Sequence, residues 1–428
     1  VVVCTRLALA VLASSLDQTV VATAMPHIAS DLNGLEHAAW IGTAYLVAAA
    51  AATPIYGKLI EVFGVAQMCL LSIALFLAGS LGCGLASDMN MLIGFRAMAG
   101  IGGETMFGLS LVAIDAVAPR GRRADLQGAF NAIFVVSSLV GPMIGGAFTD
   151  RVSWRWVFYI HVPIGIIAAF AVVFVLRLEG TAGSAREKLM RIDYLGSAVL
   201  TGAVVSLLLA VSWGGSTYPW SSTPVVIALF AAIILLFLFL WVEGWLAKEP
   251  IIAGSIVFQR NTFLSLLVAF LAEWGVFTLI YYMSLFYQLV RDTSAIRSGV
   301  LLLPFLLCVC LWTIGTPMIV KRLNWWIYPA LLSGGLALAS VAHGFTIMLG
   351  ETEYIAAESI MLACIGIGYG CISSTIYLAG QASVAQHERP VMMMLIAFVQ
   401  HLGAAVGLSV SGSVFNNALA KNVIKHGG

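Results

Sequence analysis

Long apolar runs without charged residues recur from one end of this 428-residue chain to the other. Each run is close to the roughly 20 residues that an α-helix needs to cross a hydrocarbon core about 30 Å thick. Only 10% of the residues are charged, against about 25% in an ordinary soluble domain. Helices satisfy their backbone hydrogen bonds internally, which makes them the expected element in lipid. The sequence therefore predicts an all-α, polytopic membrane protein.

Apolar runs bounded by charge, glycine or proline divide the chain into 13 predicted membrane spans. Six of them precede residue 180, two follow, and five complete the chain. They lie near 3 to 26, 37 to 60, 66 to 87, 90 to 117, 125 to 149, 154 to 177, 193 to 213, 224 to 246, 262 to 289, 298 to 320, 326 to 348, 354 to 380 and 390 to 418.

Basic residues are distributed unevenly between the loops that join these spans. If the first span runs outward, the inner loops carry 13 Lys and Arg residues and the outer loops carry 6. Cytoplasmic loops of membrane proteins carry the excess of basic residues, so we expect a cytoplasmic N-terminus. The net charge of the chain is only +1, which gives no sign of a nucleic-acid partner.

An internal repeat with an offset of 266 residues predicts two related halves. Because the repeat equates the fourth and fifth spans with the twelfth and thirteenth, it places two extra spans between the halves. The expected parts are a six-helix half at 1–180, a two-helix insert at 181–250 and a second half at 251–428 in which five helices are visible and a final sixth is missing. The repeated residues are Gly100-Ile101-Gly102 with Gly366-Ile367-Gly368, Arg123 with Arg389, and Gly141 with Gly407.

Other classes of site find no support in the sequence. The seven cysteines lie in or beside apolar runs without disulfide or metal-ligand spacing, so they are interpreted as small buried hydrophobic residues. No Gly-x-x-x-x-Gly-Lys-Ser/Thr loop is present, so direct use of ATP is not expected. The seven histidines are scattered, whereas a membrane enzyme should cluster its His, Asp or Cys residues. We therefore expect a non-enzyme without metal or cofactor.

Several segments resemble the major facilitator superfamily, and specifically its 14-helix drug:proton antiporter branch with its fungal multidrug and toxin exporters. The first span carries a segment similar to that branch's first-helix signature, and the fourth carries an intramembrane arginine beside glycines. The resemblance implies two six-helix halves with a two-helix insert. The matching segments are Leu16 to Pro26; Arg96 with Gly100, Gly102 and Gly103; the antiporter motif Gly141, Pro142, Gly145 and Gly146; and, in the insert, Asp193 to Gly196 and Trp213 to Gly215.

The loop after the second span departs from that family pattern. The family reads Gly-x-Leu-x-Asp-x-x-Gly-Arg-Arg, but this sequence ends the stretch in Val65-Ala66, so both arginines are replaced by apolar residues. The resemblance implies that this loop latches the two halves in one state, and we therefore expect a weakened latch with altered gating. The degenerate motif consists of Gly57, Lys58, Glu61 and Gly64.

Ionisable residues inside the spans are functional hypotheses, since each costs at least about 2.5 to 3.5 kcal/mol on insertion scales. Asp17 lies about 13 Å below the outer end of its span, and Arg96 lies about 9 Å below the outer start of its own. Similar depth predicts that the two side chains form an ion pair. Two interpretations remain open: Asp17 alternates between Arg96 and a proton, or the pair is a static structural salt bridge.

Two glutamates are expected near the midplane, one in each half. Glu104 follows Arg96 on about the same helix face, about 12 Å deeper, and is either a proton or substrate site or a structural acid. Glu273 precedes aromatic residues that either stack on a flat or cationic ligand or face lipid. The predicted proton-coupling residues are Asp17, Arg96, Glu104 and Glu273; the predicted substrate-binding residues are Glu104, Glu273, Trp274, Phe277, Tyr281, Tyr282, Gln288 and Gln400; His161 and His401 are secondary candidates.

The sequence thus predicts a proton-coupled secondary transporter that exports small amphipathic compounds, namely drugs, toxins or metabolites, by alternating access around a midplane site. Its expected partners are the small-molecule substrate, protons and the lipid bilayer, without nucleic acid. We expect a monomer in the plasma membrane, with the vacuolar membrane as the alternative. Uptake or vacuolar transport of a basic amino acid or iron chelate remains open as an alternative function, and a non-transporting receptor is a more distant one.

Overall fold

The computed structural model of the chain describes residues 2–34, 37–117, 123–175, 187, 192–215, 218–247, 250–252, 254–293, 295–323, 328–350 and 354–426. Helices dominate these ranges, with one isolated β-bridge between Gly214 and Tyr218. The elements are α1 (Val2–Asp31), α2 (Ala38–Phe63), α3 (Val65–Leu85), α4 (Met89–Val117), α5 (Arg123–Arg151), α6 (Trp156–Tyr159), α7 (His161–Val175), α9 (Tyr194–Trp213), α10 (Thr223–Trp241), the π-helix η3 (Val242–Leu246), α11 (Gly254–Val257), α12 (Arg260–Leu289), α13 (Ala295–Leu301), α14 (Leu303–Leu323), α15 (Tyr328–Gly344), the 3₁₀-helix η5 (Phe345–Met348), α16 (Ile355–Ser383) and α17 (Arg389–His426).

Eleven helices in the described part of the chain are long and apolar enough to cross a membrane. The prediction of an all-α, multi-pass membrane protein is therefore confirmed. The spans expected near 3 to 26 and 125 to 149 correspond to the long helices α1 and α5, which are not among those eleven. The number of 13 spans stays a prediction.

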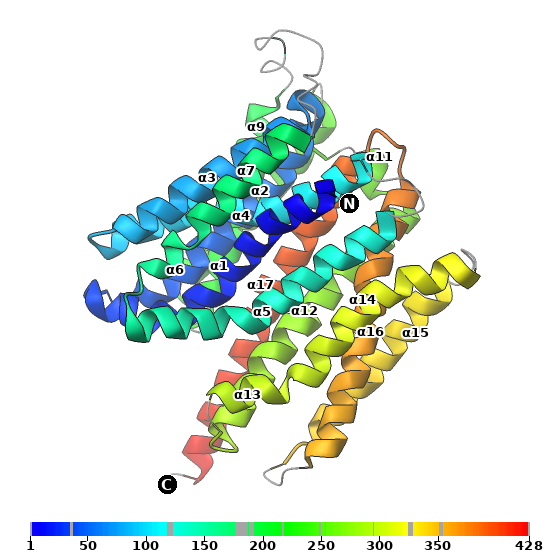
Figure 1. The fold of residues 1–428 in the computed structure, drawn as a ribbon. Helices are drawn as coiled ribbons and strands as arrows, with labels where there is room; N and C mark the ends of the chain where they lie inside the picture. The colour runs from blue at the N-terminus through cyan, green and yellow to red at the C-terminus, as the bar shows by residue number, and fades with distance from the viewer. Residues whose placement is uncertain are drawn as a thin grey trace.

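The long helices form two groups, as Figure 1 shows. In the first group α4 packs against α2 and α3, and α1 packs against α5 and α7. In the second group α16 packs against α14 and α15, while α12 packs against α17. The exact boundaries predicted for the halves and the insert stay predictions, because residues 176–186 and 248–249 lie outside the described part.

Equivalent close contacts in the two groups match the repeat found in the sequence. At each repeated glycine, a Cβ atom would collide with a neighbouring helix, so the missing side chain is what lets the backbones approach. The neighbours are equivalent in the two halves, which pairs α2 with α14, α3 with α15 and α1 with α12. The contacts are Gly100 with Tyr45 of α2 and Gly366 with Phe305 of α14, Gly102 with Phe76 of α3 and Gly368 with Gly335 of α15, and Gly141 with Thr19 of α1 and Gly407 with Trp274 of α12.

The two groups meet through α17, which packs against α2 and α4, and through α14, which packs against α5. A Cβ atom at Gly108 would meet Met394 of α17, and one at Gly57 would lie 3.4 Å from the same side chain. Arg389 and Asp115 form a weak ion pair across this boundary, with Nη1 and Oδ2 3.9 Å apart. These contacts lie toward the membrane face that carries the turn between α2 and α3.

The two-helix insert contacts both groups. Helix α9 packs against α2 and α17, as well as against α10. At the end of α9, Trp213 lies edge-on to Trp40 of α2, with ring centroids 6.2 Å apart. Trp220, in the connection to α10, donates a 2.7 Å hydrogen bond from Nε1 to the Ser413 hydroxyl of α17. The insert therefore joins the two groups at the membrane face opposite the α2 to α3 turn.

A single residue, Gly64, separates α2 from α3. Its φ of 93° and ψ of 156° fall in a region that only glycine occupies readily. We expect Gly64→Ala to lower the free energy of unfolding by about 1–3 kcal/mol, because the new Cβ makes this backbone conformation strained. Denaturant unfolding in detergent micelles measures the effect. Gly299→Ala is the control, since a Cβ there meets nothing within 4 Å, and an equal loss in both variants would contradict the explanation.

Candidate functional site

Asp17 of α1 and Arg96 of α4 form the ion pair that their predicted depth indicated. Oδ2 of Asp17 lies 2.6 Å from Nη1 of Arg96, and the two side chains are 0% and 2% exposed. Nε of Arg96 donates a 2.9 Å hydrogen bond to the Ile41 carbonyl of α2, and its guanidinium carbon lies 4.3 Å from the ring centroid of Tyr45. The pair thus ties three helices together by charge and hydrogen bonds.

His161 lies on the other side of Asp17. Its Nδ1 is 3.7 Å from Oδ1 of Asp17, and the imidazole is fully buried beside the ring of Phe76. Oδ1 of Asp17 and both ring nitrogens of His161 have no hydrogen-bond partner among the described residues. Asp17 therefore has one strongly bound oxygen and one oxygen without a hydrogen bond, so a proton on the second oxygen need not displace Arg96.

Glu104 lies in the same helix as Arg96, about 12 Å further along it at 1.5 Å per residue. It contacts side chains of both halves. Its Oε2 accepts a 2.6 Å hydrogen bond from Nε2 of Gln18 in α1. Its Oε1 lies 2.5 Å from Nε2 of His401 in α17. The carboxyl is nearly buried, at 8% exposure of its side chain. Glu104 is thus a direct polar link between the two groups of helices.

Glu273 of α12 belongs to a second, adjacent polar cluster. Its Oε1 accepts a 2.9 Å hydrogen bond from Nε2 of Gln400, and the Tyr377 hydroxyl of α16 donates a 2.6 Å bond to Oε1 of the same Gln400. Because Gln400 and His401 are consecutive in α17, the two clusters meet at this point of the helix. Five helices, α1, α4, α12, α16 and α17, therefore contribute to one polar layer, which we call the central polar layer; its residues are Gln18, Glu104, Glu273, Tyr377, Gln400 and His401.

The structure brings only some of the predicted substrate-binding residues to this layer. Glu104, Glu273 and Gln400 belong to it. Trp274 follows Glu273 and packs against Phe270 and α17, Tyr281 is 57% exposed, and Gln288 lies near the end of α12, bonded to Ser284 and Ser298. The roles proposed for Trp274, Phe277, Tyr281, Tyr282 and Gln288 stay predictions.

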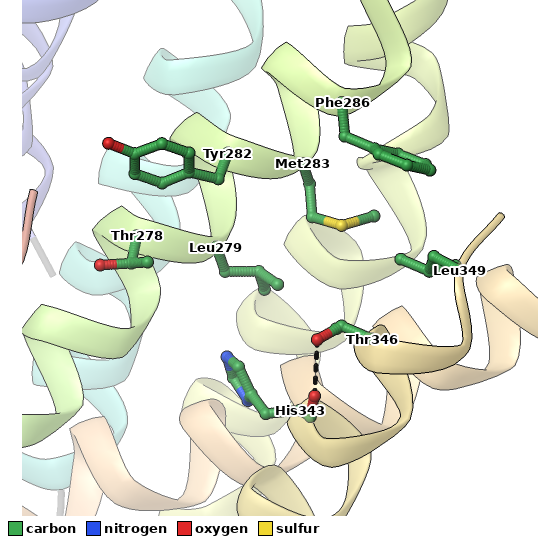
Figure 2. A pocket seen from close by; sticks show the side chains of 8 residues that line it. All are labelled: Thr278, Leu279, Tyr282, Met283, Phe286, His343, Thr346 and Leu349. Atoms are coloured by element: carbon green, nitrogen blue, oxygen red, sulfur yellow. Dashed lines mark hydrogen bonds between the residues drawn. The ribbon is translucent and has the colours of Figure 1, made fainter. Parts of the chain in front are cut away.

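A cavity of about 270 Å³ lies between α12 and the end of α15, and its lining contains no residue of the central polar layer. Figure 2 shows Tyr282, one of the predicted substrate residues, on one side of it and His343 on the other. In the first group α7 packs against α1 and α3, which are the counterparts of α12 and α15. The cavity therefore lies between two helices whose counterparts in the first group are covered by α7, and we do not assign it to transport. The full lining is Thr278, Leu279, Tyr282, Met283, Phe286, His343, Thr346 and Leu349.

The two motifs taken from the family resemblance lie at helix contacts. Gly141 of the antiporter motif allows α5 to approach Thr19 of α1, whereas a Cβ at Gly146 would meet nothing within 4 Å. The side chain of Pro142 lies outside the described residues, and the Gly145 carbonyl accepts a 2.7 Å bond from Thr149. In the degenerate loop motif, Lys58 and Glu61 form a 3.0 Å ion pair within α2. Their roles in gating and antiport stay predictions.

Sequence reasoning missed Gln18 and Tyr377 and gave His401 only a secondary place. Gln18 follows Asp17 directly, and a second polar residue inside an apolar span was the available signal. The partner of His401 is 297 residues away in the chain. No local pattern links such positions, because only the packing of α17 against α4 brings them together.

Comparison with known sequences gives a consistent result over nearly the whole chain. A family model described as the Major Facilitator Superfamily matches residues 7–192 and 194–408. The efflux pump aunC of Aspergillus niger is 34% identical, with 99% of this chain and 80% of the relative covered. The multidrug transporter protein MdtP of Bacillus subtilis is 36% identical, with 96% of this chain and 74% of the relative covered.

Comparison with solved structures supports the same fold. The human organic anion transporter MFSD10 superposes with a TM-score of 0.68 at 16% identity, covering 97% of this chain and 93% of that one. The proton:xylose symporter XylE superposes with a TM-score of 0.58 at 13% identity, covering 99% of this chain and 95% of that one. At such low identity these likenesses carry the fold and no further property.

Proposed function

Because this chain belongs to the major facilitator superfamily of membrane transporters, we propose that it exports small amphipathic compounds in exchange for protons. The substrate binds at the central polar layer, where side chains of both halves converge, and the halves expose this layer to one side of the membrane at a time. Binding at mid-depth between repeated halves is the general arrangement of such transporters. The relatives named as an efflux pump and a multidrug transporter support export as the direction.

The observation that carries this proposal is the set of three acids inside the membrane. Asp17 pairs with Arg96, Glu104 bonds to side chains of both halves, and Glu273 bonds to the neutral Gln400. Acids at this depth are costly in lipid and are retained mainly where they bind ions or protons. A carboxyl group that takes up a proton on one side and releases it on the other couples the two fluxes.

The aromatic and apolar surroundings of the layer support amphipathic substrates. Trp274 follows Glu273 directly, and Tyr377, which belongs to the layer, donates its hydroxyl to Gln400. Flat apolar molecules stack on such rings, while the acids and amides provide hydrogen bonds. We propose in addition a monomer in the plasma membrane. We also propose a cytoplasmic N-terminus, which the excess of basic residues in the expected inner loops supports.

Transport by reconstituted protein tests this function. We expect protein in liposomes with an imposed pH gradient to move a fluorescent amphipathic compound, and to stop when a protonophore removes the gradient. Asp17→Asn and Glu104→Gln should lower this flux to the level seen without a gradient, because neither amide binds a transferable proton at neutral pH. Fluorescence of the compound measures the flux.

Asp88→Asn is the matched control for the first variant, since this exposed residue at the start of α4 lies far from the polar layer. If Asp17→Asn and Glu104→Gln both keep full gradient-driven flux at equal protein amounts, the assignment of these acids as proton sites is wrong. A wild-type flux that ignores the pH gradient for every compound in a broad panel would overturn the proposed proton coupling itself.

A further inference from the structure

The hydrogen bond between Glu104 and His401 joins the two halves near mid-depth, further from the α2 to α3 turn than their other contacts through α17 with α2 and α4. It is about 18 Å from the start of α17, at 1.5 Å per residue. Closer to the α2 to α3 turn, the packing of Gly57 and Gly108 around Met394 closes the boundary. Separation of the halves on that face must therefore break the Glu104 to His401 bond as well.

The second nitrogen of His401 determines how many protons this bond holds. Nδ1 lies 2.6 Å from the Ala397 carbonyl of the same helix. A carbonyl oxygen only accepts hydrogen bonds, so Nδ1 carries a hydrogen and donates it. Between Nε2 and Oε1 of Glu104 there is then room for one proton. The pair is either imidazolium with carboxylate or neutral imidazole with carboxylic acid.

The strength of this bond depends on that proton. With no proton between them, Nε2 and the carboxylate oxygen are two acceptors facing each other, and the contact is repulsive. With two protons, the Nε2–H group meets a carboxyl that has lost its charge, so the bond loses its charge assistance. The one-proton state is therefore the state in which the halves are held together most strongly at this layer.

We propose that His401 and Glu104 jointly hold one transferable proton across the boundary between the halves, so that loss of this proton to water favours separation on the face that carries the α2 to α3 turn. No bond other than N–H or O–H is made or broken. The inference deepens the proposed function and rests on it. In this proposal His401 is the residue of the second half that positions Glu104. The Asp17 and Arg96 pair, by contrast, lies wholly within the first half.

Other titratable groups surround this pair and define its setting. Glu273 of α12 and Tyr377 of α16 are both bonded to Gln400, the neighbour of His401 in α17. Helix α9 carries one titratable residue, Tyr194 at its start, and α5 carries its charges only toward its two ends. The helices packed against α4 and α17 carry further titratable groups along the membrane-spanning part of their length, among them Asp17 of α1, Tyr45 and Tyr56 of α2, Cys69 of α3, Arg96 of α4, Glu273 of α12, and Tyr369 and Tyr377 of α16.

Distances between spin labels at Gln67 and Gln386 test the inference. Gln67 lies near the start of α3 in the first half, and Gln386 lies just after the end of α16 in the second half. Labels attached to a genetically encoded amino acid spare the seven native cysteines. In purified wild-type protein in lipid nanodiscs, we expect the long-distance population to grow as the pH rises. His401→Gln should lose this pH dependence, because its amide donates to Glu104 at any pH. Glu104→Gln should also lose this pH dependence, because the amide that replaces the carboxyl can either donate to Nε2 or accept from it.

His343→Gln is the matched control. His343 also lies in a helix of the second half, and its Nδ1 contacts a carbonyl four residues earlier, Ala339, at 2.8 Å, as His401 contacts Ala397. The control should keep the wild-type pH profile. Wild-type distances that do not change with pH, or an unchanged profile in His401→Gln and Glu104→Gln, would overturn the inference. If one variant does not fold, the other decides the question alone, since each removes one partner.

Failure of the inference is distinguishable from failure of the proposed function. Gradient-driven flux together with an unchanged pH profile of the label distances in both variants rejects only the shared proton. Label distances that respond to pH through His401, in a protein whose flux ignores the gradient, reject only the proton coupling.

Discussion

Arg96→Met is expected to lower the free energy of unfolding by about 3–5 kcal/mol, because it leaves the Asp17 carboxylate buried without its cation. Asp17 is 0% exposed, and Arg96 provides its strong contact at 2.6 Å. His161 is more distant, at 3.7 Å. Denaturant unfolding in detergent micelles measures the change.

The double variant Asp17→Asn with Arg96→Met is the control that isolates the charge. It removes both charges at once, so most of the stability should return even though the side chains remain altered. A double variant as unstable as Arg96→Met would show that the guanidinium stabilises the fold through Ile41 and Tyr45 rather than through Asp17. Gradient-driven flux of the double variant separates a static salt bridge from a proton site, because a static bridge predicts that flux returns with the stability, whereas a proton site predicts that flux stays lost without Asp17.

The Asp17 and Arg96 pair was predictable because depth within a span follows from counting residues along a helix. The helices themselves were predictable for a similar reason, since each apolar run has the length of a membrane crossing. Breaks inside the spans were harder to place. The run expected near 154 to 177 is divided between α6 and α7 at Ile160, and α13 and α14 are separate helices where one span near 298 to 320 was expected.

The central polar layer shows where sequence reasoning reaches its limit. Glu104 and Glu273 were identified because a charge inside an apolar run is visible in the sequence. Gln400 was identified as well, but Gln18 and His401, the partners of Glu104, are polar residues whose significance depends on which helices are neighbours. Gln288 illustrates the reverse case, since it shares α12 with Glu273 but lies about 22 Å further along the helix at 1.5 Å per residue.

Gly100→Ala and Gly366→Ala are each expected to destabilise the protein, and by similar amounts, because the repeat gives both residues the same packing role. A Cβ at Gly100 would lie 2.2 Å from the Tyr45 carbonyl oxygen, and one at Gly366 would lie 2.4 Å from the Phe305 carbonyl oxygen. Overpacking typically costs about 1–3 kcal/mol, and a backbone atom is less able to move aside than a side chain. The gain of about 1 kcal/mol that alanine brings in a helix offsets only part of the cost expected for a clash with a backbone atom. Unfolding in detergent micelles gives both values.

Gly94→Ala in α4 is the matched control, because it adds the same methyl group to the same helix with nothing within 4 Å. It should be neutral or slightly stabilising. Destabilisation by Gly100→Ala alone would mean that the second half tolerates a wider separation of α16 from α14, and that the two halves do not use their glycines alike. Equal losses in the two variants, with a neutral control, tie the 266-residue repeat to a shared physical cause: the backbones of α4 and α2, and of α16 and α14, approach too closely for any side chain.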